Sequence, residues 1–115
     1  MVSEGTPERG DIVWLDFDPQ AGREQAGRRP ALVLSSVEYN RKVGLMLCCP
    51  ITSKVKGYPF EVPLPEGLAI SGVVLSDQIR SLDWRTRNAK QVARVTESIL
   101  EAVCQLVAAL WEPDA

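Results

Sequence analysis

The chain reads DIVWLDFD at residues 11–18, and this alternating stretch decides the class of fold. From Val13 onward the odd-numbered positions are apolar, whereas the even-numbered positions carry Trp14 and two aspartates. Successive side chains of a strand point to opposite faces, so this alternation predicts a half-buried β-strand.

Short apolar runs of the same kind fill most of the remaining sequence and are separated by glycine, proline and polar residues. They predict further strands at residues 31–35, 45–52, 60–64, 72–79 and 90–95. Pro50 lies inside one of these runs and predicts a sheet edge or a bulge there. Cys48 and Cys49 are adjacent in the same run, and we expect their side chains on opposite faces.

The C-terminal residues follow a different period. From Ile99 on, apolar residues fall at positions 99, 100, 103, 106, 107, 110 and 111, which is the spacing of one helical face. Thr96 is the expected N-cap, and Pro113 ends the pattern. Several short strands followed by one helix predict a mainly β (α+β) fold, a small antiparallel barrel or twisted sheet capped by the helix.

Length and composition bound the function. At 115 residues with 45% hydrophobic content, we expect one domain spanning residues 1–115. The chain has no histidine, which excludes Ser-His and Cys-His catalysis and histidine metal clusters. Its three cysteines fit no metal spacing, and no signal peptide or membrane-length apolar run is present. We therefore expect a reduced, soluble, cytoplasmic protein.

The formal net charge of −2 hides a segregation of charge along the chain. Arginine and lysine exceed aspartate and glutamate in residues 23–56 and again in residues 80–94, and the segments around them are acidic. If the two basic segments meet in space, they form a phosphate-binding face. The alternative is that these are ordinary solvated surface charges.

The most polar segment is the predicted loop at residues 22–30. Arg29 directly precedes Pro30, which favours extended backbone and places the arginine at the start of a strand. Glu24 lies earlier on the loop and is a candidate acid or base. The alternative is a surface ion pair between the two, which contributes at most about 1 kcal/mol.

Two further polar clusters follow strands. In PITSKVK, residues 50–56, hydroxyl side chains end a hydrophobic strand and two lysines come next, a pattern suited to phosphate oxygens. In DQIRSLDWRTR, residues 77–87, Trp84 lies among arginines, a composition typical of single-stranded RNA binding. Alternatively, the first cluster is an ordinary strand end and Trp84 belongs to the core.

Five motifs in order carry a family resemblance. They are GDIVW at residues 10–14, EQ at 24–25 with RPALVL at 29–34, CPITS at 49–53, KGYPFEV at 56–62 and DQIRS at 77–81. Over about residues 9–111 the chain resembles the MazF/PemK family of toxin endoribonucleases. The resemblance implies an SH3-like antiparallel β-barrel of the CcdB/MazF kind with a C-terminal α-helix, a homodimer, and sequence-specific cleavage of single-stranded RNA without metal or cofactor. It also implies a MazE-like antitoxin whose acidic, disordered tail occupies the RNA groove.

The resemblance carries the catalytic pair onto Arg29 and Thr52, with Glu24 as a further polar position of the site. It places Lys56, Gln78, Arg80, Arg85 and Arg87 along the RNA path, and we assign Ser53 and Arg28 to the same path. Arg28 is a departure, because some relatives carry histidine at that position.

The chemistry fits these residues. RNA supplies its own nucleophile, the ribose 2′-hydroxyl, so cleavage requires a proton acceptor, stabilisation of the phosphorane and protonation of the leaving 5′-oxygen. Arg29 and Thr52 can donate hydrogen bonds to the developing charge. Arginine is a poor base at neutral pH, so Glu24 is the candidate base. The expected products are a 2′,3′-cyclic phosphate and a 5′-hydroxyl.

Two other functions remain open at this point. One is a non-enzymatic inhibitor of DNA gyrase on the same fold, similar to the CcdB toxins. The other is an RNA-binding module without cleavage activity.

Overall fold

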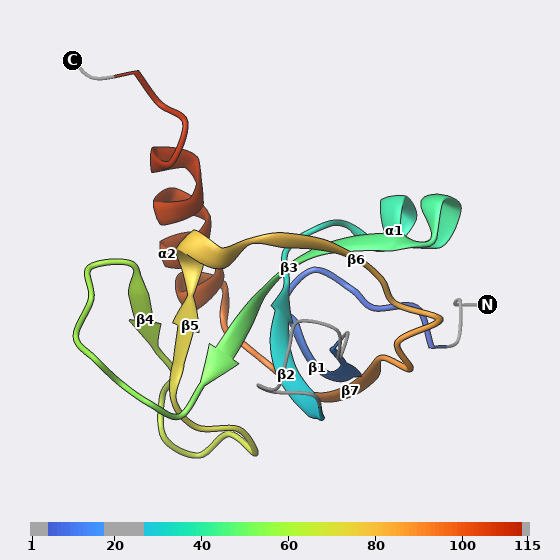
Figure 1. Cartoon of the computed structure of the whole chain (residues 1–115), viewed down its shortest axis with the longest axis horizontal. Coiled ribbons are helices and arrows are strands. Elements are labelled where there is room, and N and C mark those ends of the chain that lie inside the picture. Colours follow the sequence, from blue (N-terminus) through green and yellow to red (C-terminus); the bar gives the residue numbers. More distant parts are fainter. Residues whose placement is uncertain (1–4, 18–26, 114–115) are drawn as a thin grey trace.

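The computed structural model describes residues 5–17 and 27–113 (Figure 1). The strands are β1 (Asp11–Asp16), β2 (Arg28–Val33), β3 (Leu45–Thr52), β4 (Glu61–Pro63), β5 (Val73–Leu75), β6 (Arg80–Asp83) and β7 (Lys90–Arg94). The helices are α1 (Val37–Val43), the short 3₁₀ helix η1 (Ser76–Gln78) and α2 (Glu97–Ala109). The predicted mainly β fold with a C-terminal helix is confirmed.

All seven strands belong to one antiparallel sheet, in the order β4-β5-β3-β2-β1-β7, with β6 also paired to β3. In the described residues, the pairing runs from β4 to β7 without closing into a ring. The sheet is therefore an open relative of the barrel we expected. Figure 1 shows α2 beside β4 and β5, and α1 at the other end of the molecule near β6.

Strand β3 joins the two halves of this sheet. Its first residues, from Leu45 to Cys48, pair with β6, whereas Ile51 and Thr52 pair with β5. Pro50 falls between these two ladders and is opposite Ala31 of β2. A proline lacks the N–H that a ladder needs, so the gap between β6 and β5 accommodates it inside a long strand.

Strand β1 is buried on both faces, so the expectation of a half-buried strand was wrong. Ile12 packs in a cluster with Leu100 and Val103 of α2. Val13 and Leu15 pack on the opposite side, in a second cluster that includes Leu82 of β6 and Trp84. The sheet thus has a core on each side, and Cys49 and Cys48 belong to one core each, as their alternation predicts.

The other differences from expectation are local. The run at 72–79 is not one strand, because η1 separates β5 from β6. Helix α1 was not anticipated, since its seven residues are too few to show a helical period. Its caps are regular: the hydroxyl of Ser36 accepts a hydrogen bond from Tyr39 N, and Gly44 ends the helix at φ 83°.

Helix α2 begins after Thr96, as expected, and buries Leu100, Val103 and Val107 against the sheet. The Thr96 side chain makes no capping bond to the helix backbone; its Oγ1 lies 3.2 Å from the hydroxyl of Ser98. Among the described residues, no helix is long and apolar enough to cross a membrane.

Candidate active site

Arg29 and Thr52 line the same cleft, which has a volume of about 420 Å³. They come from neighbouring antiparallel strands, and each lies two residues beyond the last paired position, Ala31 opposite Pro50. The antiparallel register therefore brings to one place two residues that are far apart in sequence. The remaining lining residues are Trp14, Pro30, Ile51, Ser53, Lys54, Ala69, Ile70 and Ser71.

The Thr52 hydroxyl is oriented by the turn that follows β3. Its oxygen accepts a hydrogen bond of 3.1 Å from the backbone N–H of Lys54. A hydroxyl that accepts through a lone pair keeps its own proton for donation. Thr52 is half-buried, so the hydroxyl can serve as a donor to a ligand in the cleft while its position is fixed.

Residues 69–71, the segment that leads into β5, also line the cleft. These residues were not predicted from the sequence. They carry no charge and match no motif, so only the folded structure shows that they share a cleft with Arg29 and Thr52.

The predicted RNA-path residues divide into two groups. Ser53 lines the cleft beside Thr52. The cleft lining does not include Arg28, Lys56, Gln78, Arg80, Arg85 or Arg87. Gln78 lies on η1 and not on the strand predicted at residues 72–79, so that part of the expectation was wrong.

Three of the basic residues gather where β1 ends. The Arg28 guanidinium donates to Asp16 Oδ1 at 2.9 Å, to Asn88 O at 2.8 Å and to Trp14 O at 3.2 Å. The Arg87 guanidinium donates to Asp16 O at 3.3 Å, and the Arg80 guanidinium lies 5.4 Å from the Phe17 ring centre. These contacts show that the two basic segments of the sequence meet in space.

Trp84 belongs to the core. Its side chain is 6% exposed, and its indole N–H donates to Asn40 O at 2.8 Å. The guanidinium of the exposed Arg85 lies over this ring, 4.7 Å from its centre. The alternative of a core tryptophan is therefore the correct one.

Lys56 lies on the exposed segment between β3 and β4, away from the cleft lining. Its ammonium group is 5.8 Å from the centre of the Tyr58 ring. The backbone N–H groups of Lys56 and Gly57 donate to the Glu61 carboxylate, which fixes the turn.

Glu24, the predicted proton acceptor, lies outside the residues that the structure describes. Two other acidic groups have shifted acidities. Hydrogen bonds from the Asn88 amide and from Arg28 lower the pKa of Asp16, and the backbone N–H of Thr86 lowers the pKa of Asp83. Both carboxylates are ionised at neutral pH and serve as hydrogen-bond acceptors at strand ends.

Burial raises the pKa of Cys48 and of Cys49 to about 12. Neither thiol supplies a thiolate at neutral pH, so neither is a candidate nucleophile. In the part of the chain that the structure describes, no three cysteine, aspartate or glutamate side chains gather as a metal ion would require.

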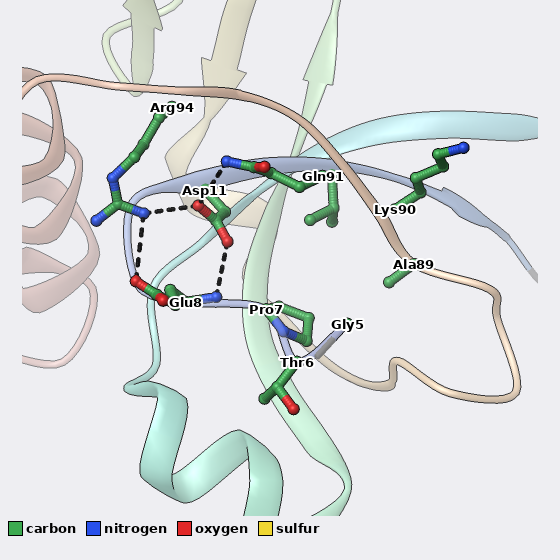
Figure 2. Close-up of a pocket in the computed structure, with 10 residues that line it drawn as sticks. Gly5, Thr6, Pro7, Glu8, Asp11, Ala89, Lys90, Gln91 and Arg94 are labelled. Carbon is green, nitrogen blue, oxygen red and sulfur yellow. Dashed lines mark hydrogen bonds and ion pairs between the residues drawn. The ribbon is translucent and has the colours of Figure 1, made fainter. Parts of the chain in front are cut away.

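A larger cavity, of about 610 Å³, lies between the N-terminal segment and β7 (Figure 2). Asp11 is buried beside it and accepts hydrogen bonds from Arg94 Nη1 at 2.6 Å, Gln91 Nε2 at 3.2 Å and Glu8 N at 2.8 Å. Arg94 also lies 3.7 Å from the Glu8 carboxylate. These polar groups are paired with one another and hold the N-terminal segment against β7. The smaller cleft that contains Arg29 and Thr52 is therefore the better candidate for an active site.

Comparison with known proteins agrees with this fold. Residues 8–111 match the family model of the PemK-like, MazF-like toxins of type II toxin–antitoxin systems. The endoribonuclease toxin MazF of Escherichia coli (strain K12) is 50% identical over 103 residues, which cover 90% of this chain and 92% of that protein.

Two solved structures are similar over most of their length. MazF (Form-I) from Deinococcus radiodurans is 56% identical with a TM-score of 0.85, over 91% of this chain and 96% of that one. The MazE–MazF complex (Form-II) from the same organism gives 56% identity and a TM-score of 0.86, over 91% and 95%. The chain belongs to the PemK-like, MazF-like family of toxins of type II toxin–antitoxin systems.

Proposed function

We propose that this chain is the toxin of a type II toxin–antitoxin system and acts as an endoribonuclease on single-stranded RNA, so that it inhibits translation and growth. The observation that carries the proposal is the meeting of Arg29 and Thr52 in one cleft. It is supported by relatives that are named endoribonucleases at 50% identity over most of the chain. The family match over residues 8–111 supports a single toxin domain at 1–115.

In this mechanism the ribose 2′-hydroxyl attacks the adjacent phosphorus, and the 5′-oxygen leaves. The Arg29 guanidinium donates two hydrogen bonds to the phosphorane oxygens, and the Thr52 hydroxyl donates a third. Arg29 also acts as the acid that protonates the leaving oxygen. Glu24 takes the proton from the 2′-hydroxyl. The products are a 2′,3′-cyclic phosphate and a 5′-hydroxyl.

The nucleophile belongs to the substrate, so the reaction proceeds without metal or cofactor. Cleavage at an unchanged rate in EDTA supports this statement. Loss of cleavage in EDTA that magnesium restores contradicts it.

The RNA extends from the cleft over the basic surface. Ser53 binds the RNA beside Thr52. The flanking nucleotides are held by the exposed side chains of Lys56, Gln78, Arg80 and Arg85 and by the half-buried Arg87. Arg28 adds positive charge beside this path while its hydrogen bonds brace β1 on β2. Because phosphate contacts release counterions, RNA affinity falls steeply as salt is raised.

The partner is a MazE-like antitoxin whose acidic, disordered tail covers the same basic surface. A solved MazE–MazF complex at 56% identity supports this assignment. The toxin is a cytoplasmic homodimer in which the RNA groove is shared. Light scattering at micromolar concentration tests the dimer, and a monomeric mass contradicts the shared groove.

The non-enzymatic alternative, a CcdB-like gyrase inhibitor, is not supported, because the relatives at 50% identity are named endoribonucleases. Incubation of the purified protein with a mixed-sequence transcript separates the remaining functions. Strand scission supports the toxin endoribonuclease. Binding of the transcript without scission supports an RNA-binding module. Binding of DNA gyrase by a protein that leaves the transcript intact supports the inhibitor.

A further inference from the structure

Gly72 touches the backbone of Thr52 more closely than any other residue type allows. A Cβ atom added at position 72 would overlap the Thr52 carbonyl oxygen and would lie only 2.8 Å from its carbonyl carbon. The same Cβ lies 3.1 Å from Ser53 Cα. These contacts are with backbone atoms, which unlike the end of a flexible side chain cannot rotate away.

The backbone of Gly72 is also held from the other side. Its carbonyl accepts a 2.9 Å hydrogen bond from Leu64 N, and the next residue, Val73, pairs with Thr52 in the β3–β5 ladder. Its φ of +123° is one that residues with a side chain rarely adopt. Gly72 therefore cannot recede to make room for a methyl group, and the Thr52–Ser53 peptide has to move instead.

That peptide determines where the Thr52 hydroxyl lies. It is the first link of the turn in which Lys54 N donates to Thr52 Oγ1 at 3.1 Å. Displacing it rotates the backbone of Thr52 and disturbs this hydrogen bond. Residues 69–71, which also line the cleft, lead directly into Gly72.

We propose that Gly72 is a positioning residue for RNA cleavage: its close contact with the Thr52–Ser53 peptide holds the Thr52 hydroxyl in the place that the reaction needs. The inference rests on the proposed endoribonuclease function. A catalytic group displaced by about 1 Å costs on the order of 100-fold in rate, whereas binding along the rest of the RNA path is untouched.

The test compares Gly72→Ala with Gly67→Ala. Gly67 lies on the same β4–β5 connection and has a similarly positive φ of +99°, but a Cβ there meets nothing within 4 Å. Both variants carry the backbone strain, and only one carries the clash. We expect Gly72→Ala to lower kcat by about 10- to 100-fold with KM changed less than about 3-fold, and Gly67→Ala to leave both near wild type.

A second arm shows whether Gly72 acts through Thr52. Introduced into a Thr52→Ala background, Gly72→Ala should lower kcat less than about 3-fold further, because the group it positions is already gone. An equal loss of activity in both backgrounds contradicts the proposal, as does a Gly72→Ala variant with wild-type kcat.

Circular dichroism measures the folded fraction of each variant, so that kcat is expressed per folded molecule. Trimethylamine N-oxide is added where a variant needs it to fold. A variant that regains wild-type kcat once folded overturns the inference. So does one that stays unfolded, because the clash then acts on the fold and not on the site. Failure of the wild type to cleave any RNA instead overturns the proposed function.

Discussion

Arg28 of β2 and Asp16 of β1 are register partners whose side chains form an ion pair, with Arg28 Nη1 2.9 Å from Asp16 Oδ1. The other oxygen of the same carboxylate accepts a 2.8 Å hydrogen bond from the Asn88 amide. Asp16 thus ties the end of β1 to the start of β2 and to the turn before β7. The adjacent arginine, Arg29, lines the cleft instead, so two neighbouring arginines have different roles.

Replacing Asp16 with asparagine should lower the melting temperature at about pH 7 by a few degrees. The Asn88 and Arg28 hydrogen bonds lower the folded-state pKa of Asp16 below 3.8, so its contribution to stability is complete above that pH and disappears as pH falls through the folded pKa. The melting temperatures of wild type and variant should therefore converge in acid. Differential scanning calorimetry from about pH 2 to pH 7 measures this, with Glu66→Gln as an exposed control. A constant difference across that range argues against this role of Asp16.

Trp84→Phe should lower the free energy of unfolding by about 0.5–1.5 kcal/mol, because the buried Asn40 carbonyl loses its indole donor and keeps the bond from Gly44 N. RNA affinity should stay within about 2-fold of wild type, since a buried ring cannot stack on a base. Urea unfolding and fluorescence anisotropy with a labelled oligonucleotide check the two halves. A large loss of affinity with unchanged stability would favour the stacking role.

The cysteines should react in two classes. With the pKa of Cys48 and of Cys49 raised to about 12 by burial, neither should be alkylated by iodoacetamide in the native protein near neutral pH. Cys104, half-buried on α2, is the thiol expected to react first. All three should react in guanidinium chloride. Rapid native alkylation at position 48 or 49, read by mass spectrometry of peptides, is inconsistent with this packing.

Thr52→Ser and Thr52→Ala separate the hydroxyl from the rest of the threonine side chain. Serine keeps the hydroxyl that Lys54 N orients and should retain kcat within about 10-fold, whereas alanine should lose about 100-fold or more. KM should change little in either variant. Single-turnover cleavage of a short oligonucleotide measures both constants, and equal rates for the two variants would remove the hydroxyl from the mechanism.

Much of the fold was predictable from local patterns. The alternation at 11–17 and the helical period after Ile99 reflect burial of one or both faces of regular elements, and both elements are present. The burial of β1 on both sides was not predictable, since it depends on α2 packing on one face and Trp84 on the other. Helix α1 is too short for a period to be visible.

The site was predictable in part. Motifs and their resemblance to a family pointed to Arg29 and Thr52, and the β2–β3 register explains why they meet. Gly72 carried no signal in the sequence, because its close contact is with backbone atoms that are distant along the chain. Arg28 looked like a ligand residue by charge alone, and only the structure shows its bonds to Asp16 and Asn88.

Mapping the fragment ends of a long single-stranded transcript incubated with the purified protein in EDTA shows whether this chain is a metal-independent endoribonuclease. We expect cuts at a short recurring motif, with 5′-hydroxyl and 2′,3′-cyclic phosphate ends. Arg29→Ala should be slower by about 100- to 1,000-fold. Lys42→Ala, which removes an equal charge from the exposed face of α1, should cut like wild type. Intact transcript with the wild type, or equal cleavage by Arg29→Ala, would contradict this expectation.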